Sequence, residues 1–192
     1  MRALGLDPAL GGGNAIVCAE YGEHLTILDC KTDYGLSRTE EQLEIVTRFV
    51  KAYRPSLVIV EFNSQQKGLG NDDRFKALAG LYGFRIQPHY TGVNKRYDPV
   101  FSVASMDQDF AKGLIRIPYG DDYTRTRVEP LLDQLRSWRP DVQTKRLTQD
   151  LVMALWFVWR HWAGIRKAQD VTPVAARRPS WLHSDTPIRR AS

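Results

Sequence analysis

The sequence predicts an α/β fold in which a mixed sheet carries helices on both faces. Its first 32 residues contain three strand-like segments joined by short connections, residues 1–7, 14–21 and 24–32. Consecutive strands with short connections form an antiparallel meander. Further along, apolar strand-like runs alternate with amphipathic helical segments, which is the pattern of parallel strands joined by helices. A chain with both patterns is expected to combine them in one mixed sheet.

The individual elements follow from periodicity and from turn residues. The run Leu57–Val60 is apolar without polar alternation, which indicates a strand covered on both faces. Asn71 is the expected N-cap of the helix that follows. Helices are predicted over residues 37–53, 71–83, 99–113, 124–138 and 147–164, and later strands over residues 57–61, 84–90 and 114–118. This order is that of the ribonuclease H-like fold, with a sheet of five strands or slightly more.

Length and charge indicate one folded domain followed by a basic tail. The 192 residues are 43% hydrophobic, which is enough for one sizeable core. Residues 165–192 contain six Lys or Arg against two Asp, whereas residues 1–164 contain 21 basic and 20 acidic residues. We therefore expect a folded domain over residues 1–164 and a mostly disordered tail over residues 165–192. Nucleic acid would then meet the folded domain only at a local patch.

Several function classes lack the residues that they require. No run approaches the roughly 18 apolar residues of a membrane helix, and the first residues do not resemble a secretion signal, so no membrane partner is expected. Cys18 and Cys30 stand outside any CxxC pattern and the four histidines are scattered, which argues against a zinc site. The glycines Gly11–Gly13 are not part of a GxxxxGK[ST] motif, so the chain has no P-loop for a nucleotide.

Three acidic residues occupy positions that the predicted fold brings together. Asp7 ends the first strand, Glu61 ends the fourth, and Asp150 lies in the first turn of the last helix. The first and fourth strands are central neighbours in this fold, and open α/β sheets bind ligands at the carboxyl ends of their strands. Each acid alone has a simpler explanation: a turn before Pro8, a strand cap and an interaction with the helix dipole. Together the three acids indicate a site.

The chemistry of such a site follows from its charges. Converging carboxylates repel one another, and divalent cations remove that penalty. Oxygen ligands of this kind favour Mg²⁺ or Mn²⁺. Two such ions about 3.5–4 Å apart can activate a water and stabilise the leaving oxygen when a phosphodiester is hydrolysed. We therefore predict that Asp7, Glu61 and Asp150 are catalytic and hold two Mg²⁺ or Mn²⁺ ions.

Basic residues mixed with aromatic ones surround the predicted site in the sequence. Such mixtures suit contacts with phosphates and sugars, although ordinary solvated charge explains any single residue equally well. The residues that we expect to contact double-stranded DNA are Lys67, Arg74, Lys76, Asn94, Lys95, Arg96, Arg125, Arg127, Lys145 and Arg146.

Five motifs in combination resemble a known family. They are LGLDPALGGGNAIV, LVIVEFNSQQKGLGNDD, HYTGVNKR, GLIRIP and TQDLVMALWF. This set is similar to the C-terminal nuclease domain of the large terminase subunit of tailed bacteriophages, over about residues 2–164. The resemblance implies a ribonuclease H-like endonuclease that cuts concatemeric DNA during packaging, with Asp7, Glu61 and Asp150 at the family's acidic positions. Gln149 departs from the pattern, since many relatives have two adjacent aspartates here.

The resemblance also implies partners and a location. The expected partners are an N-terminal ATPase domain outside this chain, the small terminase subunit and the portal or procapsid. The expected location is the host cytoplasm during phage assembly.

Other functions are compatible with the same residues. A RuvC-like Holliday junction resolvase shares the fold and the carboxylates, and cutting of junction rather than linear DNA would distinguish it. A transposase or integrase core fits less well, because its acid spacing is not evident. The non-enzyme alternative is a DNA-binding packaging module whose site is vestigial, and metal-dependent cleavage would exclude it.

Overall fold

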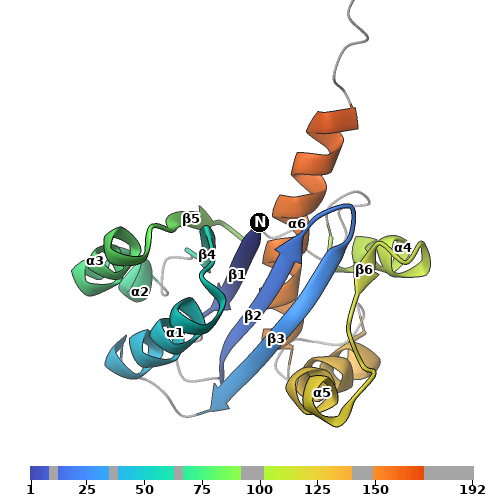
Figure 1. Ribbon diagram of the computed structural model, residues 1–192, viewed down its shortest axis with the longest axis horizontal. Coiled ribbons are helices and arrows are strands. Elements are labelled where there is room, and N and C mark those ends of the chain that lie inside the picture. The colour runs from blue at the N-terminus through green and yellow to red at the C-terminus, as the bar shows by residue number, and fades with distance from the viewer. Residues whose placement is uncertain (9–12, 35–38, 63–66, 92–101, 140–148, 171–192) are drawn as a thin grey trace, which may run out of the picture.

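In the part of the chain that the structure describes, six strands form one mixed sheet. The structure is a computed structural model, and it describes residues 1–8, 13–34, 39–62, 67–91, 102–139 and 149–170. The strand order is β5-β4-β1-β2-β3-β6 (Figure 1). The strands are β1 (Arg2–Asp7), β2 (Gly13–Tyr21), β3 (Leu25–Tyr34), β4 (Leu57–Glu61), β5 (Arg85–His89) and β6 (Ile115–Arg116).

The pairing of the strands confirms the predicted mixed sheet. β1, β2 and β3 pair as an antiparallel meander, whereas β4 pairs with β1, β5 with β4 and β6 with β3 in parallel. The first and fourth strands are therefore central neighbours, as the sequence predicts. The sixth strand comes from the short LIRIP segment.

Helices cover both faces of this sheet. In Figure 1, α1, α2 and α3 lie on one side, and α4, α5 and α6 lie on the other. The helical elements are α1 (Thr39–Tyr53), α2 (Lys67–Asn71), α3 (Asp73–Tyr82), the 3₁₀ turn η1 (Val103–Ser105), α4 (Met106–Ala111), α5 (Asp122–Ser137) and α6 (Asp150–Asp170). Among the described residues, no helix is both long enough and apolar enough to span a bilayer.

The two faces of the central strands build two separate cores. Successive side chains of a strand point to opposite faces. Leu4 and Val58 pack with α1 and α3, whereas Ala3, Leu57 and Ile59 pack with α6. Both faces of β1 and β4 are thus buried, which explains why Leu57–Val60 shows no polar alternation.

Helix α6 is the most buried helix and extends further than predicted. Trp156 and Trp162 are buried in the core. The helix continues past Gly164 to Asp170, so the helix end predicted at residue 164 moves by six residues. A glycine inside a helix costs about 1 kcal/mol, and packing beyond it offsets this, since the Arg166 guanidinium lies 4.7 Å from the Trp162 ring centroid. Residues 171–192 lie outside the described residues, and their disorder stays a prediction.

The segment after β4 forms two helices instead of the single one predicted. Asn71 is the last residue of α2, and Asp72 is the N-cap of α3, so the prediction of Asn71 as the cap is wrong. The Asp72 carboxylate accepts a hydrogen bond from the Arg74 backbone N–H at 2.8 Å. A carboxylate in this position satisfies an amide that the first helical turn leaves unpaired.

Strand β5 ends the sheet and contains a proline. The Arg85 N–H donates to the Ser56 carbonyl, and the His89 carbonyl accepts from the Phe62 N–H. Residues 85 and 89 therefore direct their peptide groups toward β4. Because the direction alternates along a strand, the N–H that Pro88 lacks would point to the opposite edge.

Candidate metal and active site

Two buried carboxylates end the two central parallel strands. The register of β1 and β4 aligns Leu6 with Val60. Asp7 and Glu61 are the next residues of these strands and therefore lie side by side. Their exposed fractions are only 7% and 4%, although acidic side chains are rarely buried unless a partner compensates their charge.

The side chains of both acids are directed toward helix α6. Ala3 of β1 and Leu57 and Ile59 of β4 belong to the core that α6 covers. Asp7 is an even number of residues from Ala3, and Glu61 is an even number of residues from Leu57 and Ile59. Because side chains alternate along a strand, both acids point to the face that these residues occupy. The sheet itself places both carboxylates under α6.

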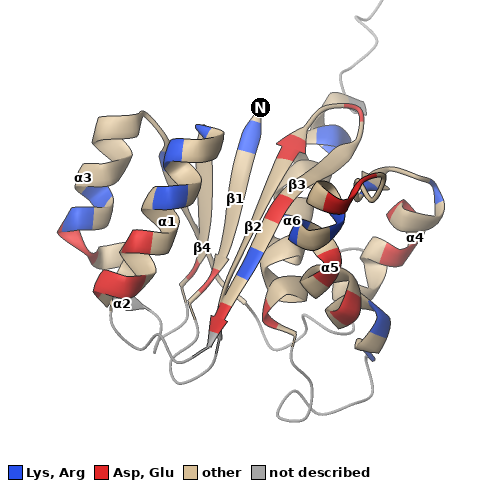
Figure 2. Ribbon diagram, turned by 60° about the horizontal axis from the view of Figure 1, so that its bottom comes forward, with Lys and Arg blue, Asp and Glu red and all other residues tan. Residues whose placement is uncertain are grey.

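Helix α6 runs antiparallel to β1 and begins at the end of the sheet where the acids lie. The Trp162 Nε1–H donates to the Gly22 carbonyl at 3.1 Å, near the start of β1, while the Ala154 carbonyl lies over Gly5. One turn before Ala154 the helix begins with Asp150. Figure 2 shows acidic segments at the carboxyl ends of β1 and β4 and at the start of α6, all toward the same side of the molecule. The structure brings the three predicted acids to one end of one face.

The three acids at this end of the sheet would offer oxygen ligands to a cation. Burial raises the pKa of the Asp150 carboxyl above its usual range, because desolvation disfavours the charged form. Among the described residues, no three His, Cys, Asp or Glu side chains form a compact cluster ready to hold an ion. The backbone places the three acids at the same end of one face, and their side chains would have to rotate about their own bonds to converge on one ion. Their donor chemistry fits Mg²⁺ or Mn²⁺.

A buried glutamine holds the start of α6. The Gln134 Oε1, from α5, accepts a hydrogen bond from the Leu151 backbone N–H at 2.9 Å, and the exposed fraction of Gln134 is 8%. This amide belongs to the first turn, where a helix supplies no partner of its own. Gln134 therefore fixes the residue that follows Asp150.

Replacing Gln134 with methionine should destabilise the protein. The variant keeps the volume but leaves the Leu151 N–H buried and unpaired, which costs about 1–3 kcal/mol. Urea denaturation should show this loss in the free energy of unfolding. Exposed Gln108 in α4 offers a matched control, and Gln108→Met should unfold as the wild type does.

His89 is a neighbour of the site that the sequence does not reveal. It ends β5 and aligns with Glu61 in the register of β4 and β5. Burial is the main reason that its pKa falls to about 4, with the positive charge of Arg160 adding to the effect. The signal in the sequence is weak: like Glu61, His89 is a polar residue at the end of a strand.

The predicted DNA-contacting residues that the structure describes lie on two separate helices. Arg74 of α3 forms ion pairs with Asp72 at 2.7 Å and with Glu40 at 2.9 Å. Lys76 forms an exposed ion pair with Asp73. The arginines of α5 lie on the other side of the sheet. The structure thus brings together the acids and not these cations, whose role in binding stays a prediction.

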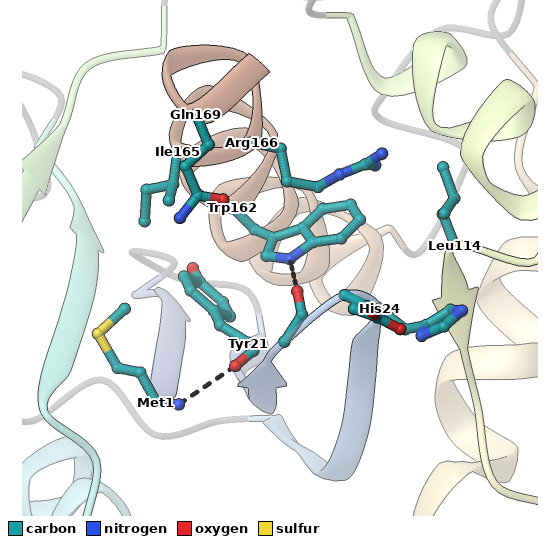
Figure 3. Close-up of a pocket in the computed structure, with 10 residues that line it drawn as sticks. Met1, Tyr21, His24, Leu114, Trp162, Ile165, Arg166 and Gln169 are labelled. Carbon is teal, nitrogen blue, oxygen red and sulfur yellow. Dashed lines mark hydrogen bonds between the residues drawn. The ribbon is translucent and has the colours of Figure 1, made fainter. Parts of the chain in front are cut away.

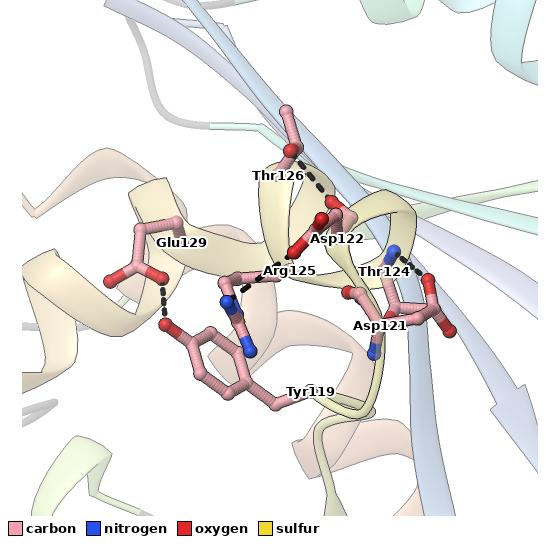
Figure 4. Close-up of polar contacts among 7 residues, drawn as sticks. All are labelled: Tyr119, Asp121, Asp122, Thr124, Arg125, Thr126 and Glu129. Atoms are coloured by element: carbon pink, nitrogen blue, oxygen red, sulfur yellow. Dashed lines mark hydrogen bonds and ion pairs between the residues drawn. The ribbon is translucent and has the colours of Figure 1, made fainter.

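The two arginines of α5 that are predicted to contact DNA, Arg125 and Arg127, are engaged by neighbouring side chains. The Arg125 guanidinium lies 4.9 Å from the Tyr119 ring centroid and 3.4 Å from the Asp122 carboxylate (Figure 4). Arg127 donates to the Tyr53 hydroxyl at 2.9 Å. The remaining predicted contacts lie outside the described side chains: Lys67, Asn94, Lys95, Arg96, Lys145 and Arg146.

A hollow lies at the end of the sheet opposite to the three acids. It has a volume of about 720 Å³ and is formed by the start of β1, the turn between β2 and β3, and the last turns of α6 (Figure 3). Tyr21, Trp162 and Arg166 line it. Since it contains none of the three acids, we do not assign it to the candidate active site.

Comparison with known proteins identifies the fold. No protein-family model and no curated protein sequence matches the chain. Among solved structures, Thermus thermophilus RuvC in complex with a Holliday junction substrate is similar with a TM-score of 0.52 and 13% identity, over 88% of this chain and 96% of RuvC. The Fowlpox virus resolvase in complex with Holliday junction DNA gives a TM-score of 0.53 and 12% identity, over 84% of this chain and 99% of the resolvase.

These similarities establish the class of fold. The chain has the RuvC-like variant of the ribonuclease H-like nuclease fold, with a mixed six-stranded sheet and helices on both faces. The predicted fold class is confirmed. The resemblance to a terminase nuclease domain has no counterpart among these structures and stays a prediction.

Proposed function

We propose that this chain is a metal-dependent endonuclease that cuts DNA. The observation that supports this most strongly is the pair of buried carboxylates, Asp7 and Glu61, at adjacent strand ends beneath the first turn of α6. Carboxylates that lie side by side repel one another, and a bound divalent cation would remove that repulsion. Asp150 supplies the third carboxylate.

Each residue has a defined role in this proposal. A pair of divalent ions, when bound, would lower the pKa of an attacking water and stabilise the leaving oxygen of the phosphodiester. Asp7 and Glu61 would hold the ions from two strands that are packed on both faces and cannot shift easily. Asp150 would close the site from α6, and its position depends on the packing of that helix against β1.

Two kinds of DNA are candidate substrates. A four-way junction is favoured by the solved structures, because two resolvases bound to Holliday junction DNA share the fold over almost their whole length. Linear concatemeric DNA is favoured by the five motifs that resemble terminase nuclease domains. The chemistry at the carboxylates would be the same, and the shape of the DNA would differ.

The first experiment is a cleavage assay on three substrates. Purified protein is incubated with supercoiled plasmid, linear duplex and a synthetic four-way junction, each with Mn²⁺, Mg²⁺ or EDTA. We expect cleavage that requires the metal. Symmetric cuts near the branch point would favour the resolvase proposal, whereas equal cutting of all substrates would favour the terminase proposal.

Glu61→Ala tests the site in the same assay. Cleavage should disappear in this variant while the protein stays folded by circular dichroism. A folded wild-type protein that cuts none of the three substrates with either metal would refute the nuclease proposal for this chain on its own and would favour a DNA-binding module.

A further inference from the structure

The row of polar side chains at the strand ends continues onto a third strand. Asp7 lies beside Glu61, and Glu61 aligns with His89 across β4 and β5. Ile86 of β5 packs with the core under α1 and α3. His89 has the opposite parity, so its side chain shares the α6 face with the two acids.

Packing against α6 fixes the His89 ring. The ring centroid lies 5.0 Å from that of Trp156 in an edge-to-face arrangement and 4.6 Å from that of Phe157. Both aromatic residues are fully buried. The imidazole is therefore held in one place beside Glu61.

One nitrogen of this ring is buried without a hydrogen-bond partner. The Nε2 atom of His89 is shielded from solvent, and no described group pairs with it. Buried polar atoms are nearly always hydrogen-bonded, and an exception requires an explanation. The indole nitrogens on the same helix satisfy this rule, since Trp159 donates to Asp109 and Trp162 donates to Gly22.

Glu61 is within reach of the His89 ring. Neighbouring strands lie about 4.8 Å apart, which a glutamate side chain and an imidazole can bridge. Carboxylates that bind metals are usually held by a hydrogen bond from a residue that does not itself touch the ion.

We propose that His89 is a positioning residue of the carboxylate site, whose Nε2–H donates to Glu61 when a divalent cation orders that carboxylate. The inference rests on the proposed metal-dependent function. It gives the buried nitrogen a partner, and it ties the orientation of Glu61 to the packing of β5 against α6.

Two variants of His89 separate positioning from packing. His89→Phe keeps an aromatic ring against Trp156 and Phe157 but has no nitrogen. His89→Gln places an amide N–H near the position of Nε2. Isothermal titration calorimetry with Mn²⁺ and no DNA gives the metal affinity, and cleavage kinetics give kcat and KM separately.

The Phe variant should bind Mn²⁺ about 10–100-fold more weakly and lose a similar factor in kcat, with KM for DNA unchanged. The Gln variant should recover most of both. The melting temperature of metal-free His89→Phe should equal or exceed that of the wild type, because the packing is kept and an unpaired nitrogen is removed.

His161→Phe is the matched control. Its Nδ1 is also buried and unpaired, but its ring contacts Tyr21, far along α6 from Asp150. This variant should bind and cleave as the wild type does. The inference is overturned if His89→Phe binds Mn²⁺ and cleaves normally, or if His89→Gln restores nothing. A folded wild-type protein that binds no Mn²⁺ would instead refute the proposed function together with the inference.

Discussion

Asp7→Asn is expected to reduce metal-dependent DNA cleavage at least about 10³-fold, which corresponds to about 4 kcal/mol of lost transition-state stabilisation. Asparagine has almost the same shape but no charge, so it removes the anionic ligand that β1 contributes beside Glu61. Asp7 is buried and lies beside Glu61. Single-turnover kinetics with excess protein would measure the effect on the chemical step.

Two controls accompany Asp7→Asn: a check that the variant is folded, and a substitution at an acid remote from the site. The circular dichroism spectrum should match that of the wild type. Asp133→Asn, in the exposed part of α5, should lose its surface ion pair with Arg136 and keep full cleavage activity. Activity within tenfold of the wild type in Asp7→Asn would contradict the assignment of the metal site.

Gly5→Ala is expected to destabilise the protein by about 3 kcal/mol, because it overpacks the contact between β1 and α6. A Cβ atom at this position would lie 2.1 Å from the Ala154 carbonyl oxygen and 3.0 Å from its carbon. These are backbone atoms of a buried helix, so no side chain can rotate away. For a domain of this size the melting temperature should fall by about 10 °C.

The same substitution should also reduce cleavage. If α6 moves away from β1, Asp150 moves with it, and a displacement of about 1 Å can cost 10²-fold in rate. Gly164→Ala on the same helix is the control, since a Cβ atom there meets no atom within 4 Å. It should leave cleavage unchanged and raise stability by about 0.5–1 kcal/mol. An unaltered melting temperature in Gly5→Ala would show that α6 is not held as closely as the structure indicates.

The meander, the central pair of first and fourth strands and the acids at their ends could be predicted, because the strands and their ends show as local patterns in a recognisable order. The meander, the continuous apolar run of β4 and the acid at each strand end are all visible in the sequence. Asp7 and Glu61 become neighbours as soon as their strands pair in parallel. The face to which the two acids point follows from the alternation of side chains along β1 and β4.

What escaped prediction depends on register and on competition between similar residues. His89 aligns with Glu61 only through the pairing of β4 with β5, and one residue of slippage would turn its side chain to the other face. Asn71 and Asp72 are both good caps, and their order along the chain does not reveal that Asn71 is already part of α2. Gly164 has the appearance of a helix end, whereas the packing of Arg166 on Trp162 continues α6 beyond it.

Pro88 restricts how two copies of this chain, or this chain and another protein, can associate. An incoming strand would have to hydrogen-bond to the outer side of β5, where the proline offers no donor. Growth of the sheet from one molecule into the next is therefore disfavoured at this edge. A partner that docks at this edge would do so through helices or loops, and the geometry of the contact would follow side-chain shape instead of backbone pairing.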